Sequence, residues 1–187
     1  MKNIEQELKM ALSEREYNIL MSVGNVEPHL QTNFYFRYKG MPRDTMIRLR
    51  KKGNEHILCY KRQMADRNGI IVCDERECEV SVDYGYSMRN RGIKKSEAKQ
   101  LLGVDVASDL ELIGYMDTYR AKFVIDQWTV ELDKNVYLGV VDYELECENM
   151  YIEQLEKLKN YLFYAYGIVF RPSKPKIQRF LEADNNK

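Results

Sequence analysis

Two carboxylates and an ammonium stand at alternate positions near the start of this chain, at Glu5, Glu7 and Lys9, with apolar residues mostly between them. Alternate residues of a β-strand share one face, so a strand over residues 2–10 would point all three charges the same way. Carboxylates at this spacing, roughly 7 Å apart, repel each other. A face that carries two of them and then a cation suits a metal ion and an anion.

Several later segments repeat the alternation of charged and apolar residues. Each carries mainly one sign of charge, whereas a solvated sheet face usually mixes both signs. Arg76 has the opposite parity from Glu77, so the two share a face only if a bulge intervenes. The like-charged sets are Arg48 and Arg50; Glu75, Glu77 and Glu79; Arg120 and Lys122; and Glu144, Glu146 and Glu148.

The composition fits one globular domain, residues 1–187, because 44% of the residues are hydrophobic and 31% are charged. The formal net charge of +0 argues against a nucleic-acid coat or a polybasic membrane binder. The four cysteines have neither CxxC nor zinc-ligand spacing, which favours reduced thiols. We find no signal-like apolar segment and no bilayer-length apolar run. We therefore expect a cytoplasmic monomer or homodimer without nucleic-acid or membrane partners.

The order of predicted elements is many short antiparallel strands with a few helices. The basic segment 89–95 is interpreted as a solvated loop, and His29 and His56 as surface or turn residues. Capping and amphipathic patterns predict helices over 14–23, 96–102 and 151–166. Strands are predicted over 2–10, 31–38, 45–51, 56–63, 71–82, 110–118, 119–125, 128–132 and 137–148.

A sheet with this alternation must bury its apolar face, and the sequence offers only a few helices to cover it. A closed barrel meets this need if its apolar side chains lie outside, under the helices, and its charged side chains line the lumen. Buried charges are tolerated only when they are paired or bound to metals and anions. The lumen therefore predicts a polyanionic ligand together with a divalent cation.

These motifs resemble the CYTH family, named for class IV adenylyl cyclase and thiamine triphosphatase, within the triphosphate tunnel metalloenzymes. The family signature ExExK corresponds to residues 5–9, and the match continues in order over nearly the whole chain. The resemblance implies an α+β fold that is mainly antiparallel β, with an eight-stranded tunnel and helices packed outside. The later matching positions are Arg48, Arg50, Lys61, Arg76, Glu77, Glu79, Arg120, Asp133, Glu144, Glu146, Glu148, Lys176 and Arg179.

The resemblance also implies roles for individual residues, with Mg²⁺ or Mn²⁺ as the cofactor. Such cations prefer carboxylate oxygens, and arginine forks bind phosphate. In such a site a water molecule, oriented by the metal or by a glutamate, attacks the terminal phosphorus. The catalytic candidates are therefore Glu7, Lys9, Glu77 and Glu146. The metal-binding candidates are Glu5, Glu7, Glu144, Glu146 and Glu148. The phosphate-binding candidates are Lys9, Arg48, Arg50, Lys61, Arg76, Arg120, Lys176 and Arg179.

Three functions fit this resemblance. The first is metal-dependent hydrolysis of tripolyphosphate or of an organic triphosphate such as thiamine triphosphate or a nucleotide. The second is a class IV-type adenylyl cyclase, for which the sequence specifies no base pocket. The third is a non-catalytic triphosphate or polyphosphate sensor. The sensor remains an alternative because the chain departs from the family pattern at one place. The family often has Asp-Thr after the aromatic pair of its second strand, whereas this chain has Arg37 and Tyr38 there.

Overall fold

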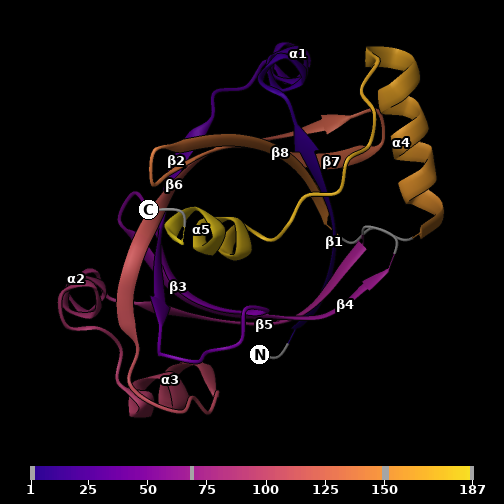
Figure 1. Ribbon diagram of the computed structural model, residues 1–187. Coiled ribbons are helices and arrows are strands. Elements are labelled where there is room, and N and C mark those ends of the chain that lie inside the picture. Colours follow the sequence, from indigo (N-terminus) through magenta and orange to yellow (C-terminus); the bar gives the residue numbers. More distant parts are fainter. Residues whose placement is uncertain (1–2, 68–69, 149–151, 186–187) are drawn as a thin grey trace.

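The computed structural model describes residues 3–67, 70–148 and 152–185, without the side chains at 3–6, 66–67, 70 and 152. Eight antiparallel strands close into a barrel in the order β1-β5-β4-β3-β2-β6-β7-β8 (Figure 1). This confirms the predicted closed eight-stranded barrel. The strands are β1 (Asn3–Leu12), β2 (His29–Arg37), β3 (Thr45–Lys52), β4 (Glu55–Arg67), β5 (Ile70–Val80), β6 (Glu111–Ile125), β7 (Trp128–Tyr137) and β8 (Val140–Glu148).

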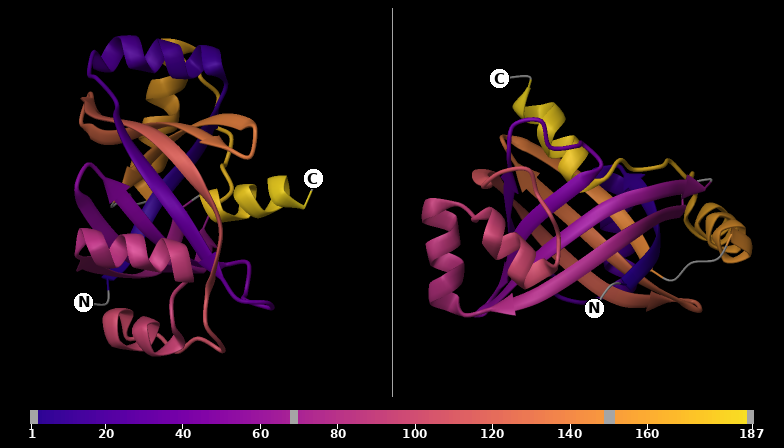
Figure 2. Two further views of the ribbon diagram at one scale, coloured as in Figure 1. Left: turned by 90° about the vertical axis from the view of Figure 1, so that its left-hand side faces the viewer. Right: turned by 90° about the horizontal axis from the view of Figure 1, so that it is seen from below.

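In the part of the chain that the structure describes, five helices pack around this barrel or at its mouth. Figure 1 looks along the barrel, with α1 and α4 on one side of the wall and α2 and α3 on another. In both Figure 1 and Figure 2, α5 lies at one mouth of the barrel. None of the helices in the described residues is long and apolar enough to cross a bilayer. The helices are α1 (Glu14–Gly24), α2 (Val82–Arg91), α3 (Lys95–Leu102), α4 (Ile152–Tyr166) and α5 (Lys176–Asp184).

The alternation of apolar and charged residues decides which side of the wall each side chain faces. Apolar residues point outward and pack under helices, where each fully buried leucine contributes about 1.5–3 kcal/mol. One core lies under α1 and α4 and includes Leu8, Leu132, Leu145, Leu20, Leu155 and Leu158. A second lies under α2 and α3 and includes Leu49, Leu58, Met88, Ala98 and Leu102. The intervening positions on the strands turn their polar and charged side chains into the barrel.

The α5 mouth is built differently from the rest of the wall. Phe180 of α5 is fully buried, and its ring centroid lies 5.1 Å from that of Tyr35 and 6.1 Å from that of Tyr137. Ile177 belongs to the same apolar cluster. This cluster seats α5 against inward-facing side chains, so apolar packing fills part of this mouth of the barrel.

Several predicted boundaries were wrong. The two strands predicted over 110–118 and 119–125 are one continuous strand, β6. The strand predicted over 71–82 ends at Val80, because Ser81 caps α2 by accepting from the Tyr84 backbone N–H. Part of the predicted basic loop 89–95 therefore belongs to α2 and α3. His56 was predicted at the surface or in a turn, but its side chain is buried beside α2.

Candidate functional site

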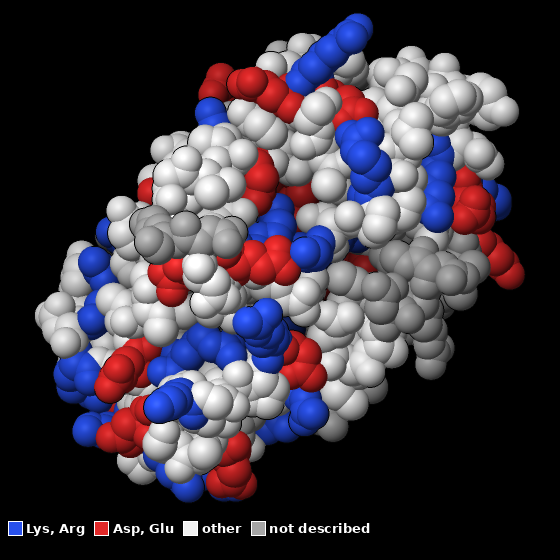
Figure 3. All heavy atoms as spheres, viewed as in Figure 1, with Lys and Arg blue, Asp and Glu red and all other residues white. Residues whose placement is uncertain are grey.

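Charged side chains from most strands and from α5 line one cavity of about 250 Å³ inside the barrel. Figure 3 looks onto the α5 mouth, where basic and acidic side chains gather around a hollow at the centre of the face. Their convergence follows from the shared inward parity of the strands. The charged lining residues are Glu7, Lys9, Arg43, Asp44, Arg48, Arg50, Lys61, Glu75, Glu77, Arg120, Glu131, Glu146, Glu148 and Lys176.

Glu146 of β8 is the carboxylate on which the most cations converge. Its oxygens accept from Lys9 of β1, from Arg120 of β6 at 2.6 Å and from Lys176 of α5 at 2.8 Å. Burial acts to raise the pKa of Glu146, but Lys176, Lys9 and Arg120 outweigh burial and hold this pKa well below its ordinary value. Glu146 is therefore ionised at neutral pH and is a weak proton acceptor.

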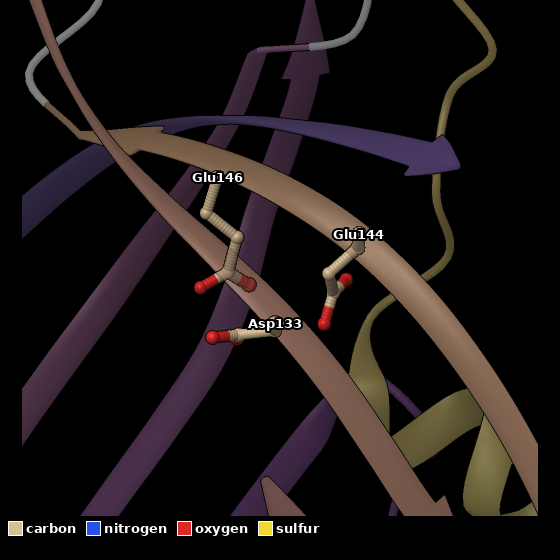
Figure 4. A group of neighbouring side chains, drawn as sticks. All are labelled: Asp133, Glu144 and Glu146. Atoms are coloured by element: carbon tan, nitrogen blue, oxygen red, sulfur yellow. The ribbon is translucent and has the colours of Figure 1, made fainter. Parts of the chain in front are cut away.

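Asp133, Glu144 and Glu146 form a buried acidic cluster on the neighbouring strands β7 and β8. Figure 4 shows the three carboxylates pointing toward one another, and one oxygen of each lies within 4.8 Å of the others. Burial acts to raise the pKa of Glu144, but Arg179 and Lys176 lower it to about 2. Oxygen donors of this kind are the ligands that Mg²⁺ and Mn²⁺ prefer. The cluster therefore fits a divalent cation.

The predicted metal set and this cluster overlap only in part. Glu144 and Glu146 were predicted as ligands, whereas Asp133 was matched to the family without a metal role. Glu7 and Glu148 line the same cavity, and the side chain of Glu5 lies outside the described residues. The missed signal for Asp133 was the alternation of Glu131, Asp133 and Asn135, which gives β7 its own polar inner face.

Lys9 and Lys61 form a second group of charges around Glu7. Lys9 Nζ lies 3.1 Å from one oxygen of Glu7, and Lys61 Nζ lies 2.8 Å from the other. Burial acts to lower the pKa of Lys9, but Glu146 and Glu7 raise it well above its ordinary value. Two of the predicted phosphate-binding lysines are thus brought into the cavity.

Arg48 and Arg50 of β3 supply the guanidinium groups of the opposite wall. Arg50 lies 3.7 Å from Glu77, and the Cys59 thiol lies 3.1 Å from the same carboxylate. Among the described residues, no hydrogen-bond acceptor meets the buried Nε atom of Arg48 or of Arg50. Buried donors without partners are costly, so these atoms fit the oxygens of an anionic ligand.

Arg179 supports the acidic cluster from α5. Its two terminal nitrogens lie 2.7 Å from Asp142 and 2.8 Å from Glu144. Arg179 was predicted to bind phosphate, and the structure places it against these carboxylates. Its position makes it a partner of Glu144 within the site.

Arg76, like Arg179, is a predicted phosphate ligand that is not among the residues lining the cavity, and Arg76 faces away from it. Its guanidinium donates to the carbonyls of Leu102 at 3.2 Å and Gly103 at 2.7 Å, and it lies over the ring of Tyr60. β5 keeps regular pairing through this position, so Arg76 faces outward while Glu75 and Glu77 face inward. The interpretation that grouped Arg76 with the lumen residues was wrong because no bulge reverses its parity.

Arg37, the departure on the second strand, has a structural environment of its own. Its guanidinium donates to the carbonyls of Thr45 at 3.0 Å, Pro42 at 3.1 Å and Met41. It thereby fixes the segment that carries Arg43 and Asp44, two residues at the cavity. Arg37 therefore shapes the entrance to the cavity from outside it.

Glu131 is another charged residue that the sequence analysis missed. It contacts Arg120, and its second oxygen lies 2.9 Å from Lys122. It extends the acidic wall from the cluster toward Glu148. The cavity thus has carboxylates on β1, β5, β7 and β8 and cations on β1, β3 and β4, while Arg120 and Lys176 contact the carboxylates of β7 and β8.

The CYTH domain model matches residues 3–181 of the chain. The chain belongs to the CYTH family. It is 28% identical over 185 residues to YjbK of Bacillus subtilis strain 168, a candidate triphosphatase by name. That alignment covers 96% of this chain and 95% of YjbK.

Solved structures of relatives share this fold. A candidate adenylate cyclase from Bacillus halodurans is 25% identical, with a TM-score of 0.74, and the match covers 96% of this chain and 98% of that one. A candidate adenylyl cyclase from Hippeastrum, described as having a dominant triphosphatase activity, superimposes with a TM-score of 0.77. At 20% identity, over 97% of this chain and 96% of the other, this second likeness shows the fold alone. CYTH proteins are metal-dependent in general, and this CYTH chain has a buried acidic cluster in its barrel.

Proposed function

We propose that this CYTH protein is a metal-dependent triphosphatase, a single domain of residues 1–187 that acts in the cytoplasm. Its substrate class is inorganic tripolyphosphate or an organic triphosphate. The observation that carries the proposal is one cavity lined by basic side chains and by Glu146, which belongs to the buried acidic cluster with Asp133 and Glu144. A triphosphate needs both, because its charge is neutralised by a metal ion and by cationic side chains together.

Asp133, Glu144 and Glu146 would hold Mg²⁺ or Mn²⁺. When bound, this cation would neutralise charge on the phosphate oxygens. Arg48 and Arg50 would bind the phosphates through their guanidinium groups, which match phosphate oxygens in pairs. The remaining cations of the site, Lys9, Lys61, Arg120 and Lys176, would add charges along the chain of phosphates. Catalysis by such a site is mostly positioning and electrostatic stabilisation.

Hydrolysis also needs a group that orients water and receives its proton. Of the glutamates predicted to be catalytic, Glu7 is engaged by Lys9 and Lys61, and Glu146 is engaged by three cations. The side chain of Glu77 is 42% exposed and borders the cavity. We assign this role to Glu77. The water oxygen bonds to the terminal phosphorus, its proton passes to Glu77, and the phosphoanhydride bond breaks with its electron pair leaving on the diphosphate.

A second candidate is an adenylyl cyclase, which is favoured by the name of the Bacillus halodurans relative. In that reaction the ribose 3′ hydroxyl attacks the α-phosphorus and pyrophosphate leaves. The two reactions share the charged cavity and differ in their products. A third candidate, a triphosphate sensor, would bind the same ligands without turnover.

The deciding experiment measures phosphate, pyrophosphate and cyclic nucleotide released from tripolyphosphate, ATP and thiamine triphosphate with Mg²⁺ or Mn²⁺. The site variants are Glu7→Gln and Lys9→Ala. Their controls are Glu156→Gln and Lys157→Ala, both on the exposed side of α4. Metal-dependent phosphate release that only the site variants lose supports the triphosphatase. Pyrophosphate with cyclic AMP would identify a cyclase, and binding without turnover would identify a sensor; either result rejects the hydrolase.

A further inference from the structure

The ammonium of Lys176 lies inside the acidic cluster. Its Nζ is 2.9 Å from Asp133 and 2.8 Å from Glu146, and it contacts Glu144. The side chain is 7% exposed and comes from α5, whereas the three carboxylates come from β7 and β8. Lys176 thus contacts every carboxylate of the set that fits a divalent cation.

We infer that Lys176 is a built-in competitor of the divalent cation, an inference that rests on the proposed metal-dependent function. A divalent ion bound to all three carboxylates would occupy the position between them that the Lys176 ammonium fills, and like charges this close repel strongly in a buried site. A divalent ion offers the cluster twice the charge of the ammonium. Metal binding therefore requires Lys176 to leave, and Lys176 sets the affinity of the cluster for metal.

The side chain of Lys176 can leave without carrying α5 away. Phe180 and Ile177 of the same helix are buried against Tyr35, Met46, Met116 and Tyr137. This apolar contact involves none of the three carboxylates. A lysine carries its compact charge on a flexible four-carbon stem, so its ammonium moves while the helix stays seated.

The displaced ammonium would remain at the cavity, which Lys176 already lines. There it would add a positive charge for a phosphate group. Arg179 can stay in place in this scheme, because it also contacts Asp142, which is not part of the acidic cluster. Metal binding would thus complete the phosphate site, and metal would bind before the triphosphate.

The test is calorimetric titration of the full-length protein with Mn²⁺, without any triphosphate. Lys176→Met removes the competing charge, and we expect Mn²⁺ to bind about tenfold tighter, within the usual range of coupling between ligands. Lys176→Arg keeps the charge, so its Mn²⁺ affinity should stay close to that of the wild type. Lys174→Met is the matched control, because Lys174 pairs with Glu182 on the exposed side of α5. Equal or weaker Mn²⁺ binding by Lys176→Met than by Lys174→Met overturns the inference.

Without the Lys176 ammonium, the three buried carboxylates have fewer positive charges to balance them. In the absence of metal, Lys176→Met should therefore melt at a lower temperature than the wild type. Mn²⁺ should then raise its melting temperature more than it raises that of the wild type, since tighter binding to the folded state stabilises it more. A crystal structure of the wild type with Mn²⁺ gives a test that needs no variant. Mn²⁺ on the cluster with the Lys176 ammonium still on all three carboxylates would overturn the competition.

These measurements separate the inference from the proposed function. If the protein hydrolyses no triphosphate but Lys176→Met binds Mn²⁺ more tightly, the competition by Lys176 is supported and the triphosphatase proposal is rejected. If the protein hydrolyses a triphosphate but Lys176→Met does not change its Mn²⁺ affinity, the triphosphatase proposal is supported and the competition by Lys176 is rejected.

Discussion

Lys9 and Glu146 are paired twice, through the backbone ladder of β1 and β8 and through their charged ends. The two residues are 137 positions apart in the chain. β1 and β8 meet only because the barrel closes, so this contact joins the first and last strands at the cavity. The site therefore depends on closure of the barrel, and its stability and its chemistry are coupled at Glu146.

Glu146→Gln should lower both the stability of the fold and the rate of phosphate release. The variant removes the negative charge that meets Lys9, Arg120 and Lys176, and it removes a candidate metal ligand. We expect phosphate release to fall about 100- to 1000-fold. The free energy of unfolding should fall by about 3–5 kcal/mol, since buried cations lose their partner. Initial rates and urea unfolding measure the two effects, with Glu156→Gln on α4 as control. A folded variant with the rate of the wild type would contradict the central place of Glu146.

Arg50 of β3 and Arg76 of β5 give a second test, because they face opposite sides of the wall. Arg50 lines the cavity and Arg76 binds the carbonyls at the end of α3. Arg50→Met should raise KM about 10- to 100-fold, the loss expected for one charged hydrogen bond of about 1.5–3 kcal/mol. Arg76→Met should leave KM unchanged and lower the melting temperature. Steady-state kinetics and thermal melts of both variants measure these effects. A raised KM in Arg76→Met would show that Arg76 takes part in binding the substrate.

The same pair shows how far alternation in the sequence predicts the site. Parity placed Arg50 and Glu77 inside correctly, because β3 and β5 keep regular pairing. The parity argument also warned against Arg76, but its match to the family pattern kept it among the candidates. Inward direction is a property of the local strand, so it is readable from the sequence wherever the strand is regular.

Contacts between distant elements were beyond the reach of the sequence. The position of Lys176 among Asp133, Glu144 and Glu146 depends on where the chain after α4 crosses the barrel. One fixing contact is backbone pairing of this segment with β1, from the Ser173 N–H to the Lys9 carbonyl. The spacing of Ile177, Phe180 and Leu181 gives α5 an amphipathic pattern that the sequence analysis missed, but the packing of α5 on the lumen residues is a tertiary contact.

Phe180 tests the seat of α5. Its ring is fully buried and packs on Tyr35, whereas Phe163 of α4 is 50% exposed. Phe180→Ala should lower the free energy of unfolding by about 3–5 kcal/mol, the usual cost of emptying a buried aromatic site. Phe163→Ala should change it by less than about 0.5 kcal/mol. Urea unfolding of both variants measures the difference, and equal losses would show that α5 contributes little to closing the mouth.

We predict that the protein loses stability in mild acid because the imidazole of His56 is buried. Its side chain is 1% exposed and lies beside Tyr86 of α2. Burial lowers the pKa of His56 from its ordinary 6.5; the backbone of Asn54 acts to raise it, while the positive charges of Lys51 and Arg89 lower it further. As pH falls below 6.5, the unfolded chain takes up a proton that the folded chain refuses, so the free energy of unfolding decreases toward the lower folded pKa.

His56→Leu removes this titration. Urea unfolding at pH 7.5, 6.0 and 5.0 should therefore show a shallower decrease in the free energy of unfolding for the variant than for the wild type. Phosphate release at pH 7.5 should stay unchanged in the folded variant, because His56 lies under α2 and not among the residues that line the cavity. Equal pH slopes would show that the His56 ring is protonated as readily in the folded chain as in the unfolded one, and the stability of the α2 face would then not depend on the neutral imidazole.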